Sequence, residues 1–348
     1  MRIAVDAMGG DFAPVEVVRG AILGSQLHDV DVILVGNTDE IKQCLPSRLP
    51  SARVTIRHAS EVIEMHEQVD AVRTKKDASI VVAAALVKEG EADAMVSMGN
   101  TAAAMATATL RLGRIRGIDR PAIATFLPNK ANGVTVMLDA GAVVDCTPEI
   151  LAQFALMGSV YCERVLGIAK PRVGLLSIGE EKTKGNELTR RTYDLLVGSR
   201  LNFIGNVEGR DLFSGAVDVM VADGFVGNVA LKTAEGLVDL VKAAIKERLR
   251  ADPLAWMATV LMLPGMLLMI PAMKRLRRSL DYSEYGGAPL LGINGVCIIG
   301  HGRSNARAVA SAVMAAKEAV ARGMVAAIRD SIASEGEPTP EAEQVLGK

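Results

Sequence analysis

The sequence contains few aromatic residues and few cysteines. Aromatic side chains make up 3% of its 348 residues, although 50% of the chain is hydrophobic. A core must therefore be built from valine, isoleucine, leucine, alanine and methionine, as in sheets that helices cover on both faces. The four cysteines, which have neither C-x-x-C nor zinc-site spacing, are Cys44, Cys146, Cys162 and Cys297. This usage indicates reduced thiols in a cytoplasmic protein rather than a disulfide framework.

The chain also lacks a charge imbalance, a targeting segment and a metal-binding pattern. Its 39 basic and 40 acidic residues give a net charge of -1, so no overall field favours a nucleic-acid partner. The first residues run directly into a strand pattern, without a basic region followed by an apolar one, which argues against secretion. No His, Asp or Glu spacing indicates a metal. We therefore expect neither a metal nor another cofactor.

Motifs for nucleotide binding and for a protein nucleophile are missing as well. Neither G-x-G-x-x-G nor G-x-x-x-x-G-K-[ST] occurs, so a nucleotide fingerprint is not supported. No G-x-S-x-G occurs, and no cysteine has a sequence cue for activation. His301 could act as a general base, although a single histidine before a glycine turn is more often structural.

What the sequence does contain is an alternation of strands and helices. The spacing is that of parallel βαβ units, which favours an α/β fold in two lobes or in one large domain. The expected strands cover 3–6, 31–36, 53–58, 92–98, 172–178, 217–222 and 295–300. The expected helices cover 15–27, 39–45, 78–88, 102–112, 149–166, 187–197 and 306–322. Two β runs, 121–127 and 133–138, are predicted to form a hairpin at a sheet edge or a subunit contact.

The segment 217–236 is the most informative stretch. A buried strand at 217–222 leads into a turn at 223–228, whose two glycines can take positive φ, and then into an amphipathic helix. The first backbone N–H groups of such a helix have no partner within the helix, and they point toward a ligand at the carboxyl edge of the sheet. This arrangement favours an anion. We therefore expect this segment to form the floor of an anion-binding active site.

Several strand exits share this pattern of glycine and asparagine before a helix. They are Gly99-Asn100-Thr101, Gly227-Asn228 and Gly302-Arg303-Ser304-Asn305, with Met8-Gly9-Gly10-Asp11 as a further glycine-rich exit. Taken singly, each exit is better explained as ordinary helix capping. Taken together, they would converge on the carboxyl edge of a parallel sheet, where α/β proteins bind ligands.

Three basic groups could meet an anion or an acidic partner. Lys184 lies in the charged loop 179–186 at another strand exit, and Arg73, Lys75 and Lys76 lie in an expected loop at 72–77. Both loops could instead be merely solvated. A third cluster, more typical of a docking surface for an acidic partner, consists of Arg111, Arg114, Arg116 and Arg120. A cleft rich in anion donors but without a protein nucleophile suggests that the anion itself is the attacking group.

Seven blocks of sequence resemble the PlsX family, the bacterial acyl-[acyl carrier protein]:phosphate acyltransferases. In order they are 8–11 (MGGD), 73–77 (RTKKD), 99–101 (GNT), 184–188 (KGNEL), 204–211 (IGNVEGRD), 223–228 (DGFVGN) and 282–292 (YSEYGGAPLLG). The match runs from Met1 to about Arg322. Val143 and Phe12 stand where the family usually has asparagine, and Ala102 stands where it usually has glycine.

The resemblance implies a fold like that of phosphate acetyltransferase and the isocitrate/isopropylmalate dehydrogenases, a three-layer α/β/α sandwich with a cleft, in a homodimer. It implies that inorganic phosphate attacks the thioester of acyl-[acyl carrier protein]. The acyl phosphate product then serves a downstream glycerol-3-phosphate acyltransferase in phospholipid synthesis. The resemblance assigns Lys184 and Asn228 as the catalytic pair. The residues expected around phosphate and substrate are Asp6, Gly9, Gly10, Asp11, Arg73, Lys76, Gly99, Asn100, Thr101, Asp223, Gly227, Ser304 and Asn305.

An uncharged segment at 254–273 is flanked by basic residues. It is long enough to span a bilayer, but Pro264-Gly265 and Pro271 argue against one continuous helix. An apolar helical hairpin inserted at 251–280 fits better, either in a core or at an anionic membrane surface, which the basic flanks favour. We expect reversible peripheral contact with the inner face of the cell membrane through Leu254, Trp256, Leu261, Leu263, Met266 and Leu268. Residues 1–333 would form the acyltransferase domain and 334–348 a flexible tail.

Three other functions stay open on the sequence alone. A phosphate acyltransferase that acts on short-chain acyl-CoA would share the fold and the phosphate site. A nicotinamide-dependent decarboxylating dehydrogenase would need a metal-binding carboxylate pattern, which is missing. A non-enzymatic membrane scaffold would turn over no thioester. Assays with both thioester carriers and with a nicotinamide cofactor separate these functions.

Overall fold

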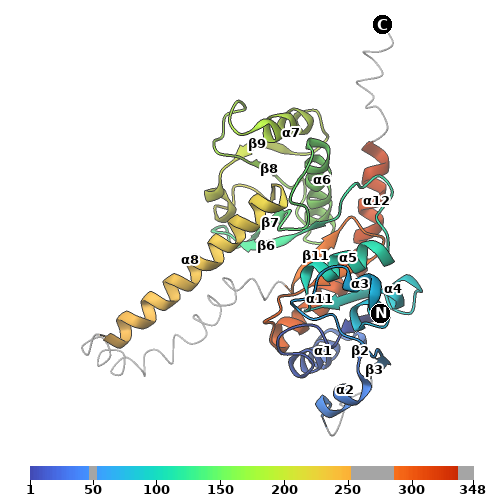
Figure 1. Ribbon diagram of the computed structural model, residues 1–348. Coiled ribbons are helices and arrows are strands. Elements are labelled where there is room, and N and C mark those ends of the chain that lie inside the picture. The colour runs from blue at the N-terminus through green and yellow to red at the C-terminus, as the bar shows by residue number, and fades with distance from the viewer. Residues whose placement is uncertain (47–52, 252–285, 336–348) are drawn as a thin grey trace.

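The computed structural model describes residues 1–46, 53–251 and 286–335. Within these ranges the chain forms two sheets that helices cover on both faces (Figure 1). The large sheet has seven strands in the order β3-β2-β1-β4-β12-β11-β5, and the small sheet has five in the order β6-β7-β10-β8-β9. This mostly parallel α/β sandwich confirms the predicted fold class.

The large sheet contains five parallel strands and two antiparallel ones at one end. The parallel strands are β1 (Arg2–Asp6), β2 (Asp31–Gly36), β3 (Val54–His58), β4 (Ala94–Ser97) and β12 (Val296–Ile299). The strand β11 (Ala288–Leu291) pairs antiparallel with β12 and with β5 (Ala122–Ile123). The helices of this half are α1 (Val15–His28), α2 (Thr38–Cys44), α3 (Ala71–Thr74), α4 (Ser79–Lys88), α5 (Thr101–Arg111) and α11 (Ala306–Ala321).

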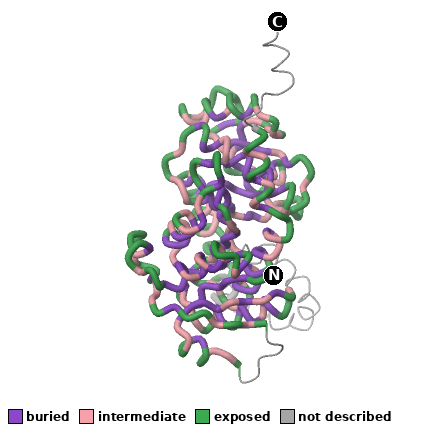
Figure 2. Tube along the Cα trace, turned by 90° about the vertical axis from the view of Figure 1, so that its right-hand side faces the viewer, coloured by how far each residue is buried: buried purple, intermediate pink, exposed green. Residues whose placement is uncertain are grey.

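Alternation along the strands explains why both faces of the large sheet are covered. On β1, Ile3 and Val5 belong to the core under α1 and α11, whereas Ala4 belongs to the core under α4. Because successive side chains of a strand point to opposite faces, an apolar run without polar interruptions needs a helix layer on each side. Figure 2 shows the resulting buried interior in both halves of the molecule.

The small sheet is built in the same way. Its strands are β6 (Thr125–Pro128), β7 (Val134–Leu138), β8 (Val173–Leu176), β9 (Phe203–Val207) and β10 (Val219–Val221). Its helices are α6 (Pro148–Arg164), α7 (Glu187–Val197), the 3-10 helix η1 (Gly209–Phe213) and α8 (Gly224–Ala251). The last helix, α12 (Met324–Glu335), packs on both α6 and α11 and so links the two halves.

The predicted hairpin is present, with one difference in its first strand. The strands β6 and β7 pair antiparallel, and β6 is the edge of the small sheet. The run 121–127, however, is divided between two sheets. Its first part is β5 of the large sheet and its second part is β6 of the small sheet, with Ala124 between them. The chain thus crosses from one sheet to the other within this run.

Other predictions need correction or fall outside the described residues. The loop expected at 72–77 contains the end of α3, the strand β11 and the helix α12 were not foreseen, and α12 extends into the expected tail at 334–348. The insertion at 251–280 lies almost wholly outside the described residues, as do all six side chains expected at the membrane. No helix in the described part of the chain is long and apolar enough to cross a membrane.

Candidate functional site

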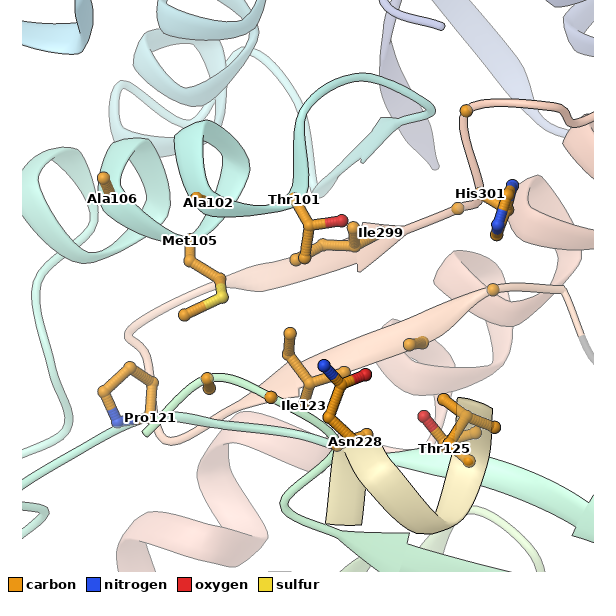
Figure 3. A pocket seen from close by; sticks show the side chains of 18 of the residues that line it. Thr101, Ala102, Met105, Ala106, Pro121, Ile123, Thr125, Asn228, Ile299 and His301 are labelled. Atoms are coloured by element: carbon orange, nitrogen blue, oxygen red, sulfur yellow. The ribbon is translucent and has the colours of Figure 1, made fainter. Parts of the chain in front are cut away.

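A cavity of about 1120 Å³ is lined by residues from both halves of the molecule (Figure 3). The large-sheet half contributes one face of α5 and the turn 299–304 after β12. The small-sheet half contributes the loop 140–145 after β7 and the first turns of α8. The predicted convergence of strand exits therefore occurs, but around a space between two sheets.

The structure brings five of the predicted site residues to this cavity and leaves the others away from its wall. The lining residues are Asp11, Arg73, Thr101, Asn228 and Ser304. The predicted residues that do not line it are Asp6, Gly9, Gly10, Lys76, Gly99, Asn100, Lys184, Asp223, Gly227 and Asn305.

Two of the predicted asparagines are helix caps. The Oδ1 atom of Asn100 accepts a hydrogen bond from Ala103 N at 3.1 Å, which caps α5. The Oδ1 atom of Asn305 accepts from the backbone N–H groups of Arg307 and Ala308, which caps α11. For these two exits the simpler explanation, ordinary capping, is sufficient.

Asn228 differs because it lies inside the first turn of a helix. The helix α8 begins at Gly224, so the turn predicted at 223–228 is wrong, and neither Gly224 nor Gly227 has a positive φ. In Figure 3 the Asn228 amide points into the cavity. Its Cβ and Nδ2 atoms pack beside Gly141, and it has no hydrogen-bond partner within the described residues. The amide is therefore available to a ligand.

The backbone at the start of α8 is already engaged by the protein. Gly224 N donates to Val143 O at 2.8 Å, and Val226 N donates to the Oδ1 atom of Asp223 at 2.9 Å. The expectation of unpaired N–H groups at this helix terminus is therefore wrong for these two donors. This leaves fewer backbone donors at the start of α8 for an anion in the cavity, and side chains such as Asn228 would supplement them.

Asp139 is a buried carboxylate that positions the wall around Asn228. Its Oδ1 accepts from Ile123 N at 2.9 Å and its Oδ2 from Val143 N at 2.6 Å. Burial raises the pKa of Asp139, although these backbone hydrogen bonds oppose the shift. A Cβ at Gly227 would lie 1.9 Å from Asp139 O, so α8 can approach this closely only with glycine there. Asp139 was missed from sequence because it looks like any polar residue at a strand end.

A second buried carboxylate lies under the glycine turn after β1. Asp6 is 2% exposed and accepts hydrogen bonds from the hydroxyls of Ser79 at 2.6 Å and Ser97 at 2.7 Å. Burial raises the pKa of its carboxyl group, and the serine hydrogen bonds work in the opposite direction. A Cβ at Gly9 would lie 2.6 Å from Asp6 Oδ2 and 2.9 Å from Gly99 N. Asp6 and Gly9 thus allow the turns after β1 and β4 to pack closely against each other.

Lys184 lies in the loop 179–186 after β8, and β8 is the parallel neighbour of β10, which leads to Asn228. Both residues therefore follow strands at the same edge of the small sheet. Lys182 of this loop pairs with Asp194 at 2.9 Å and lies over the ring of Tyr193. Within the described residues the Lys184 ammonium has no such partner.

Asn206 anchors the loop that carries Lys184. Its Nδ2 atom donates to Glu181 O at 2.9 Å, and Lys184 N donates to the same carbonyl oxygen at 3.0 Å. The side chain is 5% exposed, and its Oδ1 is buried without a partner in the described part of the structure. Asn206 lies in the quoted block 204–211, but only the fold shows what it holds.

His301 lines the cavity on the side opposite Asn228 (Figure 3). Its Nδ1 atom accepts a hydrogen bond from Arg303 N at 3.2 Å, so a neutral ring carries its proton on Nε2. His301 can therefore donate a hydrogen bond to a ligand. The turn that it forms, which looked structural in sequence, also supplies Ser304 to the cavity.

Three of the four cysteines are not activated as nucleophiles. Burial raises the pKa of Cys146, Cys162 and Cys297 to about 12 each, and at Cys146 the nearby carboxylates of Asp139 and Asp223 raise it further. Because the thiolate is the attacking form of cysteine, these three thiols are inert near neutral pH. In the described ranges, no cluster of three or more His, Cys, Asp or Glu side chains could hold a metal ion.

The fold is similar to that of phosphotransacetylases. A phosphotransacetylase from Streptococcus pyogenes superposes with a TM-score of 0.60, at 20% identity, over 92% of this chain and 94% of that one. A 4-hydroxythreonine-4-phosphate dehydrogenase from Klebsiella pneumoniae superposes with a TM-score of 0.54, at 13% identity, over 92% and 98%. At such identities the likeness shows the fold alone.

Comparison of sequences, unlike comparison of folds, identifies the family of the chain. A family model described as Fatty acid synthesis protein matches residues 1–327. A protein from Desulfitobacterium hafniense (strain DSM 10664 / DCB-2) named Phosphate acyltransferase is 54% identical over 334 residues, 95% of this chain and 98% of its own. Another of that name from Pelotomaculum thermopropionicum is 52% identical over 96% of both. The chain belongs to the Fatty acid synthesis protein family, which confirms the resemblance to PlsX proteins.

Proposed function

We propose that this protein transfers a fatty acyl group from the thioester of acyl-[acyl carrier protein] to inorganic phosphate, giving an acyl phosphate for phospholipid synthesis. The observation that carries the proposal is the cavity between the sheets, where the Asn228 amide is available to a ligand. The 54% identity to a protein named phosphate acyltransferase supports the reaction class.

In the proposed reaction, a phosphate oxygen attacks the thioester carbonyl carbon. A carbon–oxygen bond forms, and the electron pair moves to the carbonyl oxygen. As this oxyanion collapses, the carbon–sulfur bond breaks and the carrier thiolate leaves. Phosphate is already anionic at neutral pH, and a thiol of pKa ~8.5 is a good leaving group, so no strong general base is needed. The protein must align the two reactants and stabilise the oxyanion.

The side chains around the cavity suit these two tasks. Asn228, which lines the cavity, donates a hydrogen bond to the developing oxyanion. Lys184 does not line the cavity, but its loop 179–186 follows β8 at the same edge of the small sheet, and its ammonium, without a partner in the described residues, neutralises phosphate as the transition state forms. The hydroxyls of Thr101 and Ser304 and the His301 ring are further donors on the opposite wall. The inert thiols support phosphate, rather than a protein side chain, as the attacking group.

The test is phosphate-dependent thioester cleavage by the wild-type protein and by Lys184→Ala and Asn228→Ala. Loss of one such donor costs roughly 3–4 kcal/mol, so turnover should fall roughly hundred- to thousandfold. Lys182→Ala is the matched control, because that lysine is held by Asp194 in the same loop. Near-normal turnover by both variants would refute the assignment. Acyl-CoA of short chain length, assayed in parallel, identifies the carrier.

We also propose peripheral contact with the inner face of the cell membrane through the segment 254–273. Its basic flanks and its apolar length support this contact. Vesicles containing anionic lipid should bind the wild-type protein more strongly than a Leu261→Glu, Leu268→Glu double variant. Equal binding would favour a core role for this segment.

A further inference from the structure

The cavity has two chemically different ends (Figure 3). His301 and Thr125 lie toward one end, Asn228 lies near the middle beside Ile123, and Met105 and Pro121 lie toward the other end. The helix α5 connects the ends, since it begins at Thr101 and lines the cavity along one face. After Thr101 that face presents Ala102, Met105, Ala106, Thr109 and Leu110, of which only Thr109 is polar. We call this part of the cavity the apolar arm.

The cavity as a whole is larger than phosphate requires. A phosphate ion fills the space of a few water molecules, at ~30 Å³ each, whereas the cavity measures about 1120 Å³. With a rise of 1.5 Å per residue, the lining face of α5 from Thr101 to Leu110 is about 14 Å long. An extended hydrocarbon advances about 1.25 Å per carbon, from its bond length and tetrahedral angle. Roughly eleven carbons therefore fit along the arm.

We propose that the apolar arm holds the fatty acyl chain and that Met105 determines the chain length used. This inference rests on the proposed function. The Met105 side chain leaves α5 and points across the arm toward Pro121 and Ile123, while Ala102 and Ala106 beside it leave the arm wide (Figure 3). An unbranched thioether adapts to a flexible chain that passes it. The competing occupant, the pantetheine stem of the carrier, carries amides, for which the α5 face of the arm offers only the Thr109 hydroxyl.

The test compares kcat/KM for carrier-protein thioesters with acyl chains shorter and longer than about eleven carbons. Met105→Trp should block the arm. Each methylene of the acyl chain that can no longer enter the arm should lower the preference for long chains roughly fourfold. Met105→Ala should raise that preference. Met105→Leu, which conserves volume, is the control and should leave it unchanged. The KM for phosphate should stay unchanged in all three. A Trp variant that slows every chain length alike, as pantetheine in the arm predicts, or slows none, overturns the inference.

A second measurement separates this inference from the proposed reaction. A non-hydrolysable long-chain acyl phosphonate with a photoreactive diazirine near the chain end is bound to the wild-type protein and irradiated. Labelling of the α5 peptide, lost in Met105→Trp, supports the apolar arm whether or not acyl phosphate is made. Labelling elsewhere overturns it. A protein that labels on α5 but cleaves no thioester would instead refute the proposed function.

Discussion

At the scale of single residues, a side chain outside the cavity is expected to affect turnover by positioning Lys184. Asn206→Ala removes the amide that fixes Glu181 O and with it the backbone of Lys184. Because a small misplacement of a catalytic group is costly, we predict a fall in kcat of about tenfold or more. Steady-state kinetics should show little change in KM for the carrier thioester.

The matched control for this variant is Asn202→Ala. The Asn202 side chain also donates to a backbone carbonyl, Lys170 O at 2.9 Å, but away from the loop 179–186. Its turnover should equal that of the wild type. If the two variants lost kcat equally, a general loss of stability, rather than the position of Lys184, would explain the effect.

At this scale the sequence shows which residue types are present, but it does not show whether an asparagine caps a helix or faces the cavity. The strand-exit pattern pointed to Asn228, which the structure places in the cavity, and also to Asn100 and Asn305, which it shows as caps. All three follow a strand and precede or begin a helix, so the local pattern is the same. Whether an asparagine faces its own helix or an open space depends on where the helix begins, to within one turn.

At the scale of elements, the start of α8 depends on contact with Asp139. Gly227→Ala would place a Cβ 1.9 Å from Asp139 O and must displace the helix turn that carries Asn228. We predict a strong loss of turnover together with a lower melting temperature. In the same helix, a Cβ at Gly236 would meet no atom within 4 Å. Gly236→Ala should keep activity and gain up to about 1 kcal/mol from helix propensity. Equal behaviour of the two variants in thermal unfolding and turnover would contradict this account.

The junction of β8 and β10 is predicted to depend on pH. Burial raises the pKa of Asp218, but side-chain and backbone hydrogen bonds from Arg172 outweigh it and hold that pKa below its usual value. A depressed carboxyl pKa contributes stability above the unfolded value of about 3.9 and loses it as pH falls through the folded value. Asp218→Asn should therefore lower the melting temperature at pH ~7.

The difference in melting temperature between Asp218→Asn and the wild type should disappear as the pH falls below about 4. Asp239→Asn is the control, since Asp239 lies exposed on α8 with Lys242 at 3.5 Å, and exposed pairs contribute little. If the difference in melting temperature between Asp218→Asn and the wild type stayed constant across the acid range, the charge of Asp218 would not be the cause of the stability loss.

Elements with strong local patterns could be predicted, and those defined by a distant partner could not. The strand β2 (Asp31–Gly36) and the helix α7 (Glu187–Val197) have the predicted bounds. The run 121–127 reads as one strand because its β-forming residues are continuous, yet Ile123 pairs with Leu290 and Thr125 with Met137. Leu290 lies more than 160 positions from Ile123, and Met137 lies about a dozen positions from Thr125. These partners determine where the chain passes from one sheet to the other.

At the scale of the whole molecule, the helix α8 has an apolar face that nothing covers within the described residues. Leu237 is 60% exposed and Leu240 64%, and Val241 and Ile245 are exposed on the same helix, which extends away from the body in Figure 1. We propose that a second copy of the chain covers this face in a homodimer. Leu237→Glu with Val241→Glu should convert the dimer to a monomer in sedimentation velocity, whereas Asp239→Lys on the polar face should not. A wild-type monomer, or a dimer that survives both glutamates, would refute this.

The central claim is that phosphate itself breaks the acyl–sulfur bond. The most direct measurement mixes the protein with a stoichiometric amount of radiolabelled acyl-[acyl carrier protein] in the absence of phosphate and follows free carrier thiol and protein-bound label. Our account predicts that no thiol is released and no label becomes covalently bound until phosphate is added, after which acyl phosphate and thiol appear together. Release of one equivalent of thiol before phosphate, with the acyl group attached to the protein, would contradict it.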